Sequence, residues 1–549
     1  MNTEEKLQQL KILFPQTSEE KLQIRAELEL ELEAKAKESQ EQLQALPTPQ
    51  SMNDLKSYLI LVGKVKRYTD ERAKVKADLS GLTIPRLKPR VVANILEKYL
   101  HIAKLGQNSE ERTKSLAYYY DLDQGIYIPW QERWIQFALY VQDDLTPNEL
   151  NQIMTFIRAE AKEYKQTIDP NLIVCNNKIY NRKTQKTENF TPDYYFITKL
   201  STNYNEKAEL PTFNGWNPKD WLDDLGDSNP QKVKLLWQVI AYTVNANSIK
   251  KHAFFFIDDG QGRTGKGTFQ EMLAALVGED NAYALRYKDF ENTQNLGPAM
   301  NKALIIGDDN DPNFYNETSS NFKSMVTGDV ININAKYMQP YTARNTATII
   351  QSMNGKPKQK DVTGGLLRRF KIIKFNHQYE DTPEGAKIKD DYVKRREVSE
   401  WLLKEAVKVD IGKIVDTEES KQLVHEMKIE SDPVAYFMEN HFNELKSTRI
   451  PVGFMFRFYR ATREAEEGIT KISMSPRTFT TKLRNYLPSG WELDTKNKTL
   501  GDYWNHKDAE VLKSYSVEIC NKYFNEEFGE FKSKRNKYQS LIFKKTKTE

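Results

Sequence analysis

Phe254-Phe-Phe-Ile-Asp-Asp-Gly-Gln-Gly-Arg-Thr-Gly-Lys-Gly-Thr-Phe269 is the stretch that decides the fold. Its first four residues, 254–257, are apolar and predict a short buried strand. A glycine-rich loop follows, and residues 268–277 then have the pattern of an amphipathic helix. A strand, a glycine-rich loop and a helix in direct succession predict an α/β fold whose loop binds phosphate groups.

The composition of the loop indicates a nucleotide as its ligand. Glycines let the backbone turn tightly, so that several N–H groups can converge on a triphosphate. The lysine would place its charge on the β- and γ-phosphates of ATP, and the threonine would offer a hydroxyl to Mg²⁺. A glycine-rich turn that binds nothing is the alternative. It does not explain why a strand, the loop and a helix follow one another directly. The predicted nucleotide-binding residues are Gly260, Gly262, Gly265, Lys266, Gly267 and Thr268.

Length and composition limit the class of protein. A chain of 549 residues is long enough for about three or four domains. No apolar run approaches the roughly 20 residues of a membrane-spanning helix, and the first residues lack the apolar core of a signal peptide. The two cysteines, Cys175 and Cys520, have no metal-ligand spacing, which favours a reducing compartment. We therefore expect a cytoplasmic protein with no membrane partner. Because the net charge is only +4, any contact with DNA needs local basic clusters.

The first part of the chain is predicted to be mostly helical. Residues 1–45 are rich in Glu, Lys, Gln and Leu, which predicts a solvated helical arm or a helical hairpin. No strict heptad is sustained, so a long coiled coil is disfavoured. Further helices are predicted over residues 54–76, 90–105 and 147–164.

Residues 118–128 predict a β-hairpin with aromatic and β-branched arms. Asp121 and Asp123 at its turn could hold a metal ion, as the acidic pair of a primase does. Turn-forming aspartates are the favoured interpretation, because no histidine or third acidic residue follows at a supporting spacing. Residues 172–180 form a second strand-rich piece, and residues 232–243 predict a helix that packs beside the nucleotide-binding region.

Two more apolar strands are expected to bring polar side chains to the glycine-rich loop. Residues 304–306 predict a buried strand followed by Asp308 and Asp309, and residues 346–354 predict one that ends in Asn354. Ligands lie at the carboxyl ends of the strands in such sheets. One carboxylate would hold Mg²⁺, and its neighbour would polarise the attacking water. The amide would orient a water or touch the γ-phosphate without adding negative charge.

Arg368 and Arg369 precede a further predicted strand. An arginine that reaches the γ-phosphate of a neighbouring subunit stabilises the charge of the transition state. An ordinary surface pair is the alternative.

The order of these motifs resembles superfamily 3 helicases of the AAA+ class. The resemblance is carried by Gly-x-Gly-x-x-Gly-Lys-Gly-Thr-Phe269, apolar-Asp-Asp309, Val-Thr-Gly-Asp329, Ser-Met-Asn354 and Leu-Leu-Arg-Arg-Phe370. More narrowly, the chain is similar to the phage and plasmid helicase–primase branch related to the poxvirus primase–helicase. Within that branch it resembles the Rep replication initiators of staphylococcal pathogenicity islands. The resemblance covers about residues 115–549, and from residue 431 onward it is to a winged-helix region.

The resemblance implies a role for each motif residue. Lys266 and Thr268 would bind phosphate and Mg²⁺, with Asp308 as a further metal ligand. Asp309 would activate water, and because the family often has Glu at this position, Asp311 is a second candidate for that role. The sensor at the γ-phosphate would be Asn354, and the arginine finger acting in trans would be Arg369, with Arg368 as the substitute.

The resemblance also implies where DNA is contacted. Residues 330–338 alternate like a hairpin arm at the place where the family carries its pore hairpin. Lys336 and Tyr337 would then contact backbone phosphate and a sugar or base in the channel. An exposed hairpin tip is the alternative.

The C-terminal piece contains a helix suited to reading DNA. Over residues 474–486 we expect Ser475 as N-cap and Pro476 in the first turn. One face of this helix is polar and basic, which fits the major groove, although such faces are more often simply solvated. The predicted DNA-contacting residues on it are Arg477, Thr481, Lys482 and Arg484. The basic tail, residues 532–547, would add a non-specific phosphate contact.

Together these observations predict an α/β protein with an AAA+ P-loop ATPase core. We expect a helical N-terminal region (1–115), a small α+β domain (116–205), a superfamily 3 ATPase domain (206–410) and a winged-helix DNA-binding domain (411–549). The predicted function is an ATP-dependent DNA helicase and replication initiator of a mobile genetic element. It would assemble as a homo-oligomeric ring, a hexamer, and work with host replication proteins. The alternatives are an origin-binding initiator that uses ATP as an assembly switch, and a bifunctional primase–helicase.

Overall fold

The computed structural model describes most of the chain in two compact units. It covers residues 2–105, 117–130, 133–260, 262–311, 314, 319–334, 341–357, 364–470, 473–494, 496, 504–525, 530–531 and 539–543. The first unit comprises Met1–Asn310, Ser319–Asn354 and Ile373–Val415. The second comprises Asp311–Thr318, Gly355–Ile372 and Asp416–Glu549. Among the helices in these ranges, none combines the length and the apolar character that crossing a bilayer requires.

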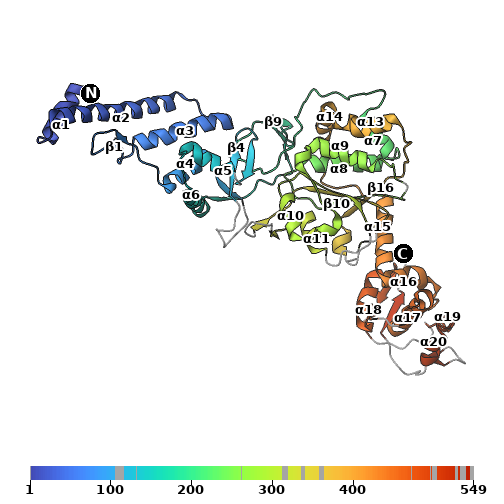
Figure 1. Cartoon of the computed structure of the whole chain (residues 1–549). Coiled ribbons are helices and arrows are strands. Elements are labelled where there is room, and N and C mark those ends of the chain that lie inside the picture. The colour runs from blue at the N-terminus through green and yellow to red at the C-terminus, as the bar shows by residue number, and fades with distance from the viewer. Residues whose placement is uncertain are drawn as a thin grey trace. The chain divides into compact units, whose positions relative to one another are not determined.

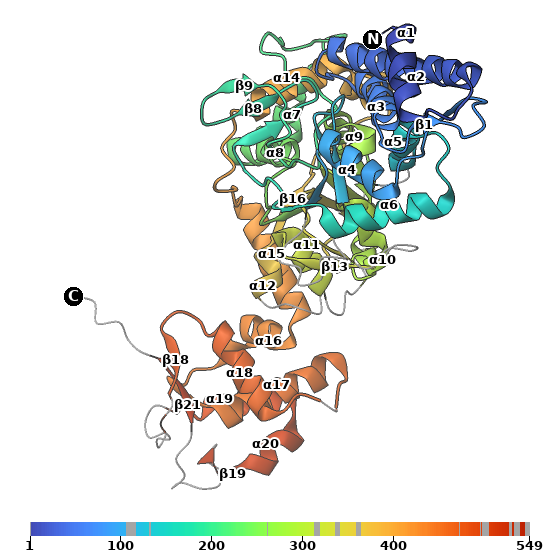
Figure 2. The ribbon, with the colours of Figure 1, turned by 90° about the vertical axis from the view of Figure 1, so that its left-hand side faces the viewer.

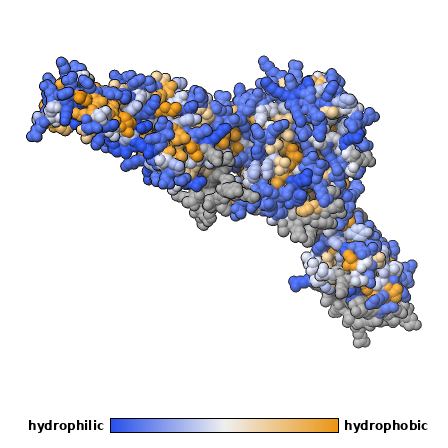
Figure 3. Space-filling view, in the orientation of Figure 1, coloured by the Kyte–Doolittle hydropathy of each residue, from blue (hydrophilic) through white to orange (hydrophobic). Residues whose placement is uncertain are grey.

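A helical hairpin opens the chain. Helix α1 (Thr3–Leu13) begins at a capping box on Asn2, and α2 (Glu19–Ala45) folds back along it (Figure 1). Lys6 pairs across the hairpin with Glu29 at 3.4 Å and with Glu33 at 2.6 Å. Of the two arrangements predicted for residues 1–45, a helical arm or a helical hairpin, the structure has the hairpin. Figure 3 shows apolar residues at the surface of the α1–α3 region, and the most exposed of them, Ile12, is 80% exposed.

The next segment combines four helices with a small sheet. The helices are α3 (Met52–Tyr68), α4 (Pro89–Tyr99), α5 (Arg133–Val141) and α6 (Pro147–Glu160). The sheet has the strand order β5-β4-β3-β6, formed by Ile126–Pro129, Ala117–Asp121, Ala103–Leu105 and Glu163–Tyr164. The β-hairpin predicted for residues 118–128 is confirmed, with Tyr120 opposite Tyr127.

The three helices predicted over 54–76, 90–105 and 147–164 end earlier than expected. Residues 74–75 form the short strand β1 (Lys74–Val75), and residues 103–105 and 163–164 belong to β3 and β6. His101, just beyond α4, has a φ of 47°, a left-handed conformation that stops a helix and turns the chain toward β3. Local composition therefore identified these helices but not their ends.

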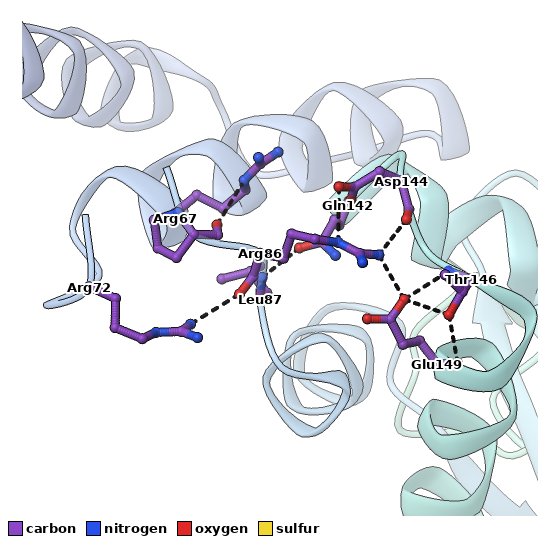
Figure 4. A network of polar contacts seen from close by, with 9 residues as sticks. Arg67, Arg72, Arg86, Leu87, Gln142, Asp144, Thr146 and Glu149 are labelled. Carbon is purple, nitrogen blue, oxygen red and sulfur yellow. Dashed lines mark hydrogen bonds and ion pairs between the residues drawn. The ribbon is translucent and has the colours of Figure 1, made fainter. Parts of the chain in front are cut away.

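The connection into α4 is fixed by a polar network around Arg86 (Figure 4). The guanidinium of Arg86 lies 3.0 Å from the carboxylate of Asp144 and 2.7 Å from that of Glu149. Beside it, the backbone N–H of Leu87 donates to the buried side-chain oxygen of Gln142 at 2.6 Å. These contacts bind a loop without regular structure to the α5–α6 connection.

A five-stranded sheet forms the centre of the first unit. Its strand order is β11-β12-β15-β10-β16, formed by Ala282–Ala284, Leu304–Asn310, Thr348–Asn354, Ala253–Asp258 and Phe370–Lys374. The pairings β11–β12, β12–β15 and β10–β15 are parallel. The mixed α/β class predicted from the sequence is thus confirmed. The apolar runs at 254–257 and 346–354 were correctly predicted to be strands.

Helices cover both faces of this sheet, which explains why its strands are continuous apolar runs. Helices α8 (Pro230–Val244), α9 (Lys266–Val277) and α14 (Arg396–Ala406) lie on one face, and α10 (Thr293–Leu296) and α11 (Ser320–Thr327) on the other (Figure 1). Phe254 and Phe256 join the core with α8 and α9. Phe255 points the other way, with its ring centroid 6.2 Å from that of Phe322 in α11.

The second unit is mostly helical and is best seen in Figure 2. Its helices are α12 (Gly364–Leu367), α15 (Glu418–Ser431), α16 (Pro433–His441), α17 (Val452–Glu467), α18 (Pro476–Leu483), α19 (Lys507–Tyr515) and α20 (Val517–Tyr523). A three-stranded antiparallel sheet has the order β17-β21-β18, formed by Arg449–Pro451, Ser540–Phe543 and Trp491–Leu493. Residues 540–543 are therefore the central strand of this sheet. This differs from the expectation that residues 532–547 act only as a basic tail, because Leu541 is fully buried in the core.

Candidate functional site

A cavity of about 680 Å³ opens at the carboxyl ends of β10, β12 and β15. Its floor is the glycine-rich loop between β10 and α9. This is the edge at which open α/β sheets bind their ligands. The lining includes most of the residues predicted to bind the nucleotide: Gly262, Gly265, Lys266, Gly267, Thr268, Asp308, Asp309 and Asn354.

The conformation of the loop requires glycine at three positions. Gly260, Gly262 and Gly265 have φ values of 86°, 70° and 83°, in the left-handed region that favours glycine. At Gly265, which caps α9, a Cβ would also lie 2.6 Å from Cδ1 of Leu225. Gly267, in the first turn of α9, lines the cavity, with only the end of Lys389 within 4 Å of a Cβ placed there. The glycines therefore shape an open cradle at a helix N-terminus.

Lys266 is held inside the cavity by three oxygen atoms. Its Nζ lies 2.6 Å from Oδ2 of Asp258, 2.9 Å from Oδ1 of Asn354 and 3.2 Å from the carbonyl oxygen of Met353. Since β10 and β15 are parallel neighbours, Asp258 and Asn354 stand side by side at the ends of their strands. The predicted proximity of Lys266 and Asn354 is thus observed.

Asp258 organises the loop and was not among the predicted site residues. Only 1% of it is exposed. Burial acts to raise the pKa of its carboxyl. The hydrogen bond from Lys266, the N–H of Gly260 at 3.0 Å and the hydroxyl of Thr264 at 3.1 Å outweigh this effect and lower the pKa. A carboxylate between a buried strand and a glycine-rich loop is the sequence signal for such a role, and Asp258 shares this signal with Asp259.

Asp308 and Asp309 lie within β12, not after it as expected. The register between β12 and β15 shifts between Gly307 and Asn310, so the two aspartates form a bulge. Asp309 has a φ of 47°. Both side chains are exposed to the cavity, and the hydroxyl of Ser352 in β15 donates to Oδ1 of Asp308. The bulge therefore turns two consecutive carboxylates toward the same cavity.

The side-chain amide of Asn310 holds the bulge in place through hydrogen bonds. Its Nδ2 donates to the carbonyl oxygens of Gly307 at 2.9 Å and Ser352 at 3.0 Å, and to Oε1 of Gln351 at 3.1 Å. Its Oδ1 accepts from the backbone N–H of Tyr287 at 2.8 Å. Because these hydrogen bonds connect Asn310 to β12, β15 and Tyr287, its side chain fixes the position of the carboxylate pair.

An aromatic wall completes the cavity and was missed by the sequence analysis. It consists of Trp221 from α7 (Pro218–Leu225) and Tyr379 from the segment before α13 (Pro383–Asp390). The N–H of Tyr379 donates to the carbonyl of Arg263 in the loop at 2.9 Å, and its hydroxyl donates to Asp224 at 2.7 Å. Burial raises the pKa of the Tyr379 hydroxyl. These residues are far apart in the chain, and no motif links them.

Several predicted site residues do not lie in this cavity. Arg368 and Arg369 belong to the second unit, where the guanidinium of Arg369 donates to the carbonyl of Gly365 in α12. Their predicted role is contact with the γ-phosphate in a neighbouring subunit, and this role stays a prediction. Asp311 also falls in the second unit. Lys336 and Tyr337 lie outside the described residues. The arms of their hairpin, β13 (Ile331–Ile333) and β14 (Tyr341–Ala343), pair antiparallel as expected.

The predicted DNA-contacting helix is present but shorter than residues 474–486. Ser475 caps α18 and Pro476 begins it, as expected, but the helix ends at Leu483. Arg477 and Thr481 are exposed on it, and Arg484 begins the following 3-10 turn, Arg484–Tyr486. Lys482 lies on the same helix, and its predicted contact with DNA stays a prediction. Its Nζ lies 3.1 Å from Oδ2 of Asp432, a carboxylate that is itself buried.

The acidic pair at the first hairpin has structural contacts. Oδ1 of Asp121 accepts from the N–H groups of Asp123 at 3.0 Å and Gln124 at 2.9 Å, and Oδ1 of Asp123 accepts from the N–H of Met52 at 3.0 Å. In the described part of the chain, no group of three or more His, Cys, Asp or Glu side chains could hold a metal ion. These contacts are those of turn-forming aspartates.

The fold and the cavity together define an α/β protein with a glycine-rich loop and strand-end carboxylates around one polar site. Three family models match the chain. They are a D5 N terminal like model over residues 127–225, a family of unknown function (DUF5906) over residues 259–369, and a Poxvirus D5 protein-like model over residues 429–528. The two D5 matches indicate a D5-like primase–helicase family for this chain.

Solved structures of another protein are similar at low identity. The A form apo structure of the NrS-1 C-terminal region aligns with 13% identity and a TM-score of 0.43, covering 83% of this chain and 100% of that chain. A second apo structure of that region has 13% identity and a TM-score of 0.41, covering 72% of this chain and 87% of that chain. At such TM-scores the likeness carries no functional argument. The D5-like family itself supports a replication-related helicase or primase activity, and hence an enzyme of the NTPase type.

Proposed function

We propose that this chain is an ATP-dependent DNA helicase and replication initiator of the superfamily 3 AAA+ class, and that the glycine-rich loop is its P-loop. The observation that carries the proposal is the cavity in which the loop, Lys266, the carboxylate pair and Asn354 meet. The proposal extends to a mobile genetic element, to a hexameric ring and to host replication partners. For these three, the support is the motif resemblance described above.

The residues around the cavity fit Mg·ATP. The N–H groups at the start of α9 and the left-handed glycines offer donors to a triphosphate. The hydroxyl of Thr268 and the carboxylate of Asp308 are the hard oxygen ligands that Mg²⁺ prefers. When bound, Mg²⁺ would neutralise charge on the phosphates. The aromatic wall of Trp221 and Tyr379 offers apolar surface to the nucleoside.

Lys266 would change partners when the nucleotide binds. In the present structure, Asp258 and Asn354 hold its ammonium group inside the cavity. Phosphate oxygens would replace the amide oxygen of Asn354, which is then released to hold a water molecule. Asp309 would orient this water for attack. Phosphoryl transfer depends chiefly on such positioning and on charge neutralisation.

Two further steps of the proposal involve a neighbouring subunit and DNA. Arg369, or Arg368 in its place, would reach the γ-phosphate bound by the next subunit of the ring. Hydrolysis would then move a strand past Lys336 and Tyr337, while Arg477, Thr481 and Arg484 of the second unit would contact duplex DNA at the origin. A winged-helix role for this unit is part of the proposal and is supported by its recognition-type helix α18.

The substitution Lys266→Ala tests the proposal. We expect DNA-stimulated ATP hydrolysis to fall by about 100-fold or more and unwinding of a forked duplex to be lost. Lys374→Ala is the matched control, because Lys374 pairs with Asp259 at 2.9 Å but does not line the cavity. A fully active Lys266→Ala protein would overturn the proposal. ATP-dependent assembly on DNA without strand separation would instead support the assembly-switch alternative.

A further inference from the structure

A second cavity in the first unit lies away from the glycine-rich loop. Its volume is about 130 Å³. Three parts of the unit form its walls: the β13–β14 hairpin, the segment just before β12, and the small sheet β5-β4-β3-β6 with the segment that follows it. Two of its lining residues, Tyr118 and Val330, belong to the predicted hairpins, but it shares no residue with the cavity at the glycine-rich loop.

The size of this cavity fits one planar ring. An apolar cavity of about 150 Å³ engineered into another protein takes one benzene molecule. A single six-membered ring therefore fills a space of this size, whereas the two fused rings of a purine exceed it.

Two tyrosines line the cavity. Tyr118 lies on β4 and is 6% exposed, and Tyr341 begins β14, opposite Ile333 of β13. Burial and then the nearby Tyr341 raise the pKa of Tyr118, and burial raises the pKa of Tyr341, so both remain neutral phenols. Neutral aromatic faces are the surfaces on which unpaired bases stack.

Two amide groups in the lining lack a partner. The Nε2 atom of Gln166 and the Oδ1 atom of Asn301 are buried and have no hydrogen-bond partner among the described residues. The great majority of buried polar side-chain atoms in proteins are hydrogen-bonded. One is a donor and the other an acceptor, so together they complement an edge that carries both an acceptor and a donor. The exposed edge of a pyrimidine base has this pattern.

Positive charge lies beside the same cavity. Lys165 is exposed at its wall, and the guanidinium of Arg344 lies in the lining, where it donates to the carbonyl oxygen of Gly328 at 2.6 Å. Lysine and arginine side chains contact the phosphates on either side of a bound nucleotide. A base that is attached to a strand therefore fits better than a free uncharged ring.

We propose that this cavity takes one extruded pyrimidine base of single-stranded DNA, stacked against Tyr118 and Tyr341 and hydrogen-bonded to Gln166 and Asn301. The proposal rests on the proposed function, because it places the base beside strand β14 of the hairpin that would contact the translocating strand. The occupied cavity would hold the strand beside the hairpin between steps. A free pyrimidine nucleotide has the same ring and a phosphate, and is the other possible source of this ligand chemistry.

The test is binding of fluorescein-labelled oligonucleotides to the full chain at one fixed salt concentration. The probes are oligo(dT), oligo(dA) and an oligomer of equal length whose central nucleotides are abasic. We expect oligo(dT) to bind at least about fivefold more tightly than the abasic oligomer, which is the lower end of the range for stacking of one base. The double variant Gln166→Leu/Asn301→Leu should lose this preference and keep the affinity for the abasic oligomer. Its melting temperature should not fall, because Nε2 of Gln166 and Oδ1 of Asn301 have no hydrogen-bond partner among the described residues.

Controls separate this proposal from the proposed function. Gln294→Leu removes an exposed amide of α10 and should keep the preference for oligo(dT). Lys266→Ala should also keep it, since the two cavities are separate. Equal affinity of the wild-type chain for oligo(dT) and the abasic oligomer would overturn the base-binding proposal alone, provided that ATP hydrolysis is intact. Tight binding of dTMP that the double variant loses and that does not compete with oligo(dT) would also overturn it, by assigning the cavity to a free nucleotide.

Discussion

A single buried carboxylate, Asp258, positions both the glycine-rich loop and the lysine that the loop carries. It accepts hydrogen bonds from Gly260 and Thr264 and forms an ion pair with Lys266. The alternation of apolar and polar residues does not reveal this role, because Asp258 follows the apolar run and precedes Asp259, which is 72% exposed at its side chain. Which of two adjacent aspartates points inward depends on the pleat of β10.

Replacing Asp258 with Asn should therefore destabilise the first unit by about 2 kcal/mol, the scale of hydrogen bonds to a charged group. The folded-state pKa of Asp258 is lowered relative to its unfolded value of about 3.9. Its contribution is thus present above that pH and is lost as the pH falls through the folded value. Urea unfolding should show the full difference between wild type and Asp258→Asn at pH 6 and a smaller one below about pH 4. Asp259→Asn should show neither effect, and equal losses in both variants would contradict the assignment.

The buried side chain of Lys250 should give the stability of the fold the opposite dependence on pH. It is 2% exposed, its ammonium group donates to Ser248 at 2.8 Å and to the carbonyl of Asn245, and burial and then the charge of Arg182 lower its pKa to about 7. The unfolded chain binds this proton up to about pH 10, so the buried amine destabilises the fold most at and below pH 7.

Lys250→Met should consequently raise the melting temperature at pH 6 and have a smaller effect near pH 10. Each kcal/mol regained corresponds to roughly 2–4 °C. Lys251→Met changes a neighbouring exposed lysine and serves as the control. A Lys250→Met protein that melts lower at pH 6 would show that the hydrogen bonds of Lys250 outweigh the burial of its charge.

At the level of elements, the sequence predicted the strands of the site better than their registers. The apolar runs of β10, β12 and β15 identified three strands, and the carboxyl-end rule predicted that their polar residues would meet. The bulge at Asp308 and Asp309 was not predictable, because hydrophobic pattern does not tell whether a strand keeps or shifts its pairing. The aromatic wall of Trp221 and Tyr379 was missed because it depends on tertiary packing alone.

The bulge leads to a prediction that separates function from stability. Asp309 holds a left-handed φ of 47°, which is unfavourable for a residue with a Cβ. Asp309→Gly should therefore stabilise the first unit by about 1 kcal/mol and at the same time abolish most ATP hydrolysis. Asp308→Gly, at a position without positive φ, should lower both stability and activity. Thermal unfolding and phosphate release on the two variants check this, and a destabilised Asp309→Gly protein would argue against strain at the bulge.

On the scale of the whole molecule, the predicted site is divided between the two units. The cavity, with Lys266 and the carboxylate pair, lies in the first unit, and Arg368 and Arg369 lie in the second. The sequence analysis assigned all of these residues to one catalytic site, because their motifs follow one another in a characteristic order along the chain. Order alone does not tell whether an arginine acts on the nucleotide of its own chain or on that of the next subunit.

Mixing two inactive variants distinguishes these arrangements. If each site combines Lys266 of one subunit with Arg369 of the next, Lys266→Ala and Arg369→Ala are each inactive as pure rings. In a one-to-one mixture, intact sites re-form where a chain carrying Lys266 meets a chain carrying Arg369. Random assembly makes about a quarter of the interfaces intact, so about a quarter of the wild-type ATP hydrolysis should return.

Parallel measurements on Arg368→Ala identify which arginine is the finger. The variant of the finger should be inactive alone and regain about a quarter of the activity in the mixture, whereas the variant of the other arginine should be active alone. If each chain supplied both groups to its own site, a mixture of Lys266→Ala and Arg369→Ala would contain no intact site and would stay inactive at any ratio. An Arg369→Ala protein that is fully active alone would remove this residue from the site altogether. Recovery that rises with total protein concentration would further show that the active species is an assembly, because exchange of subunits between rings depends on association.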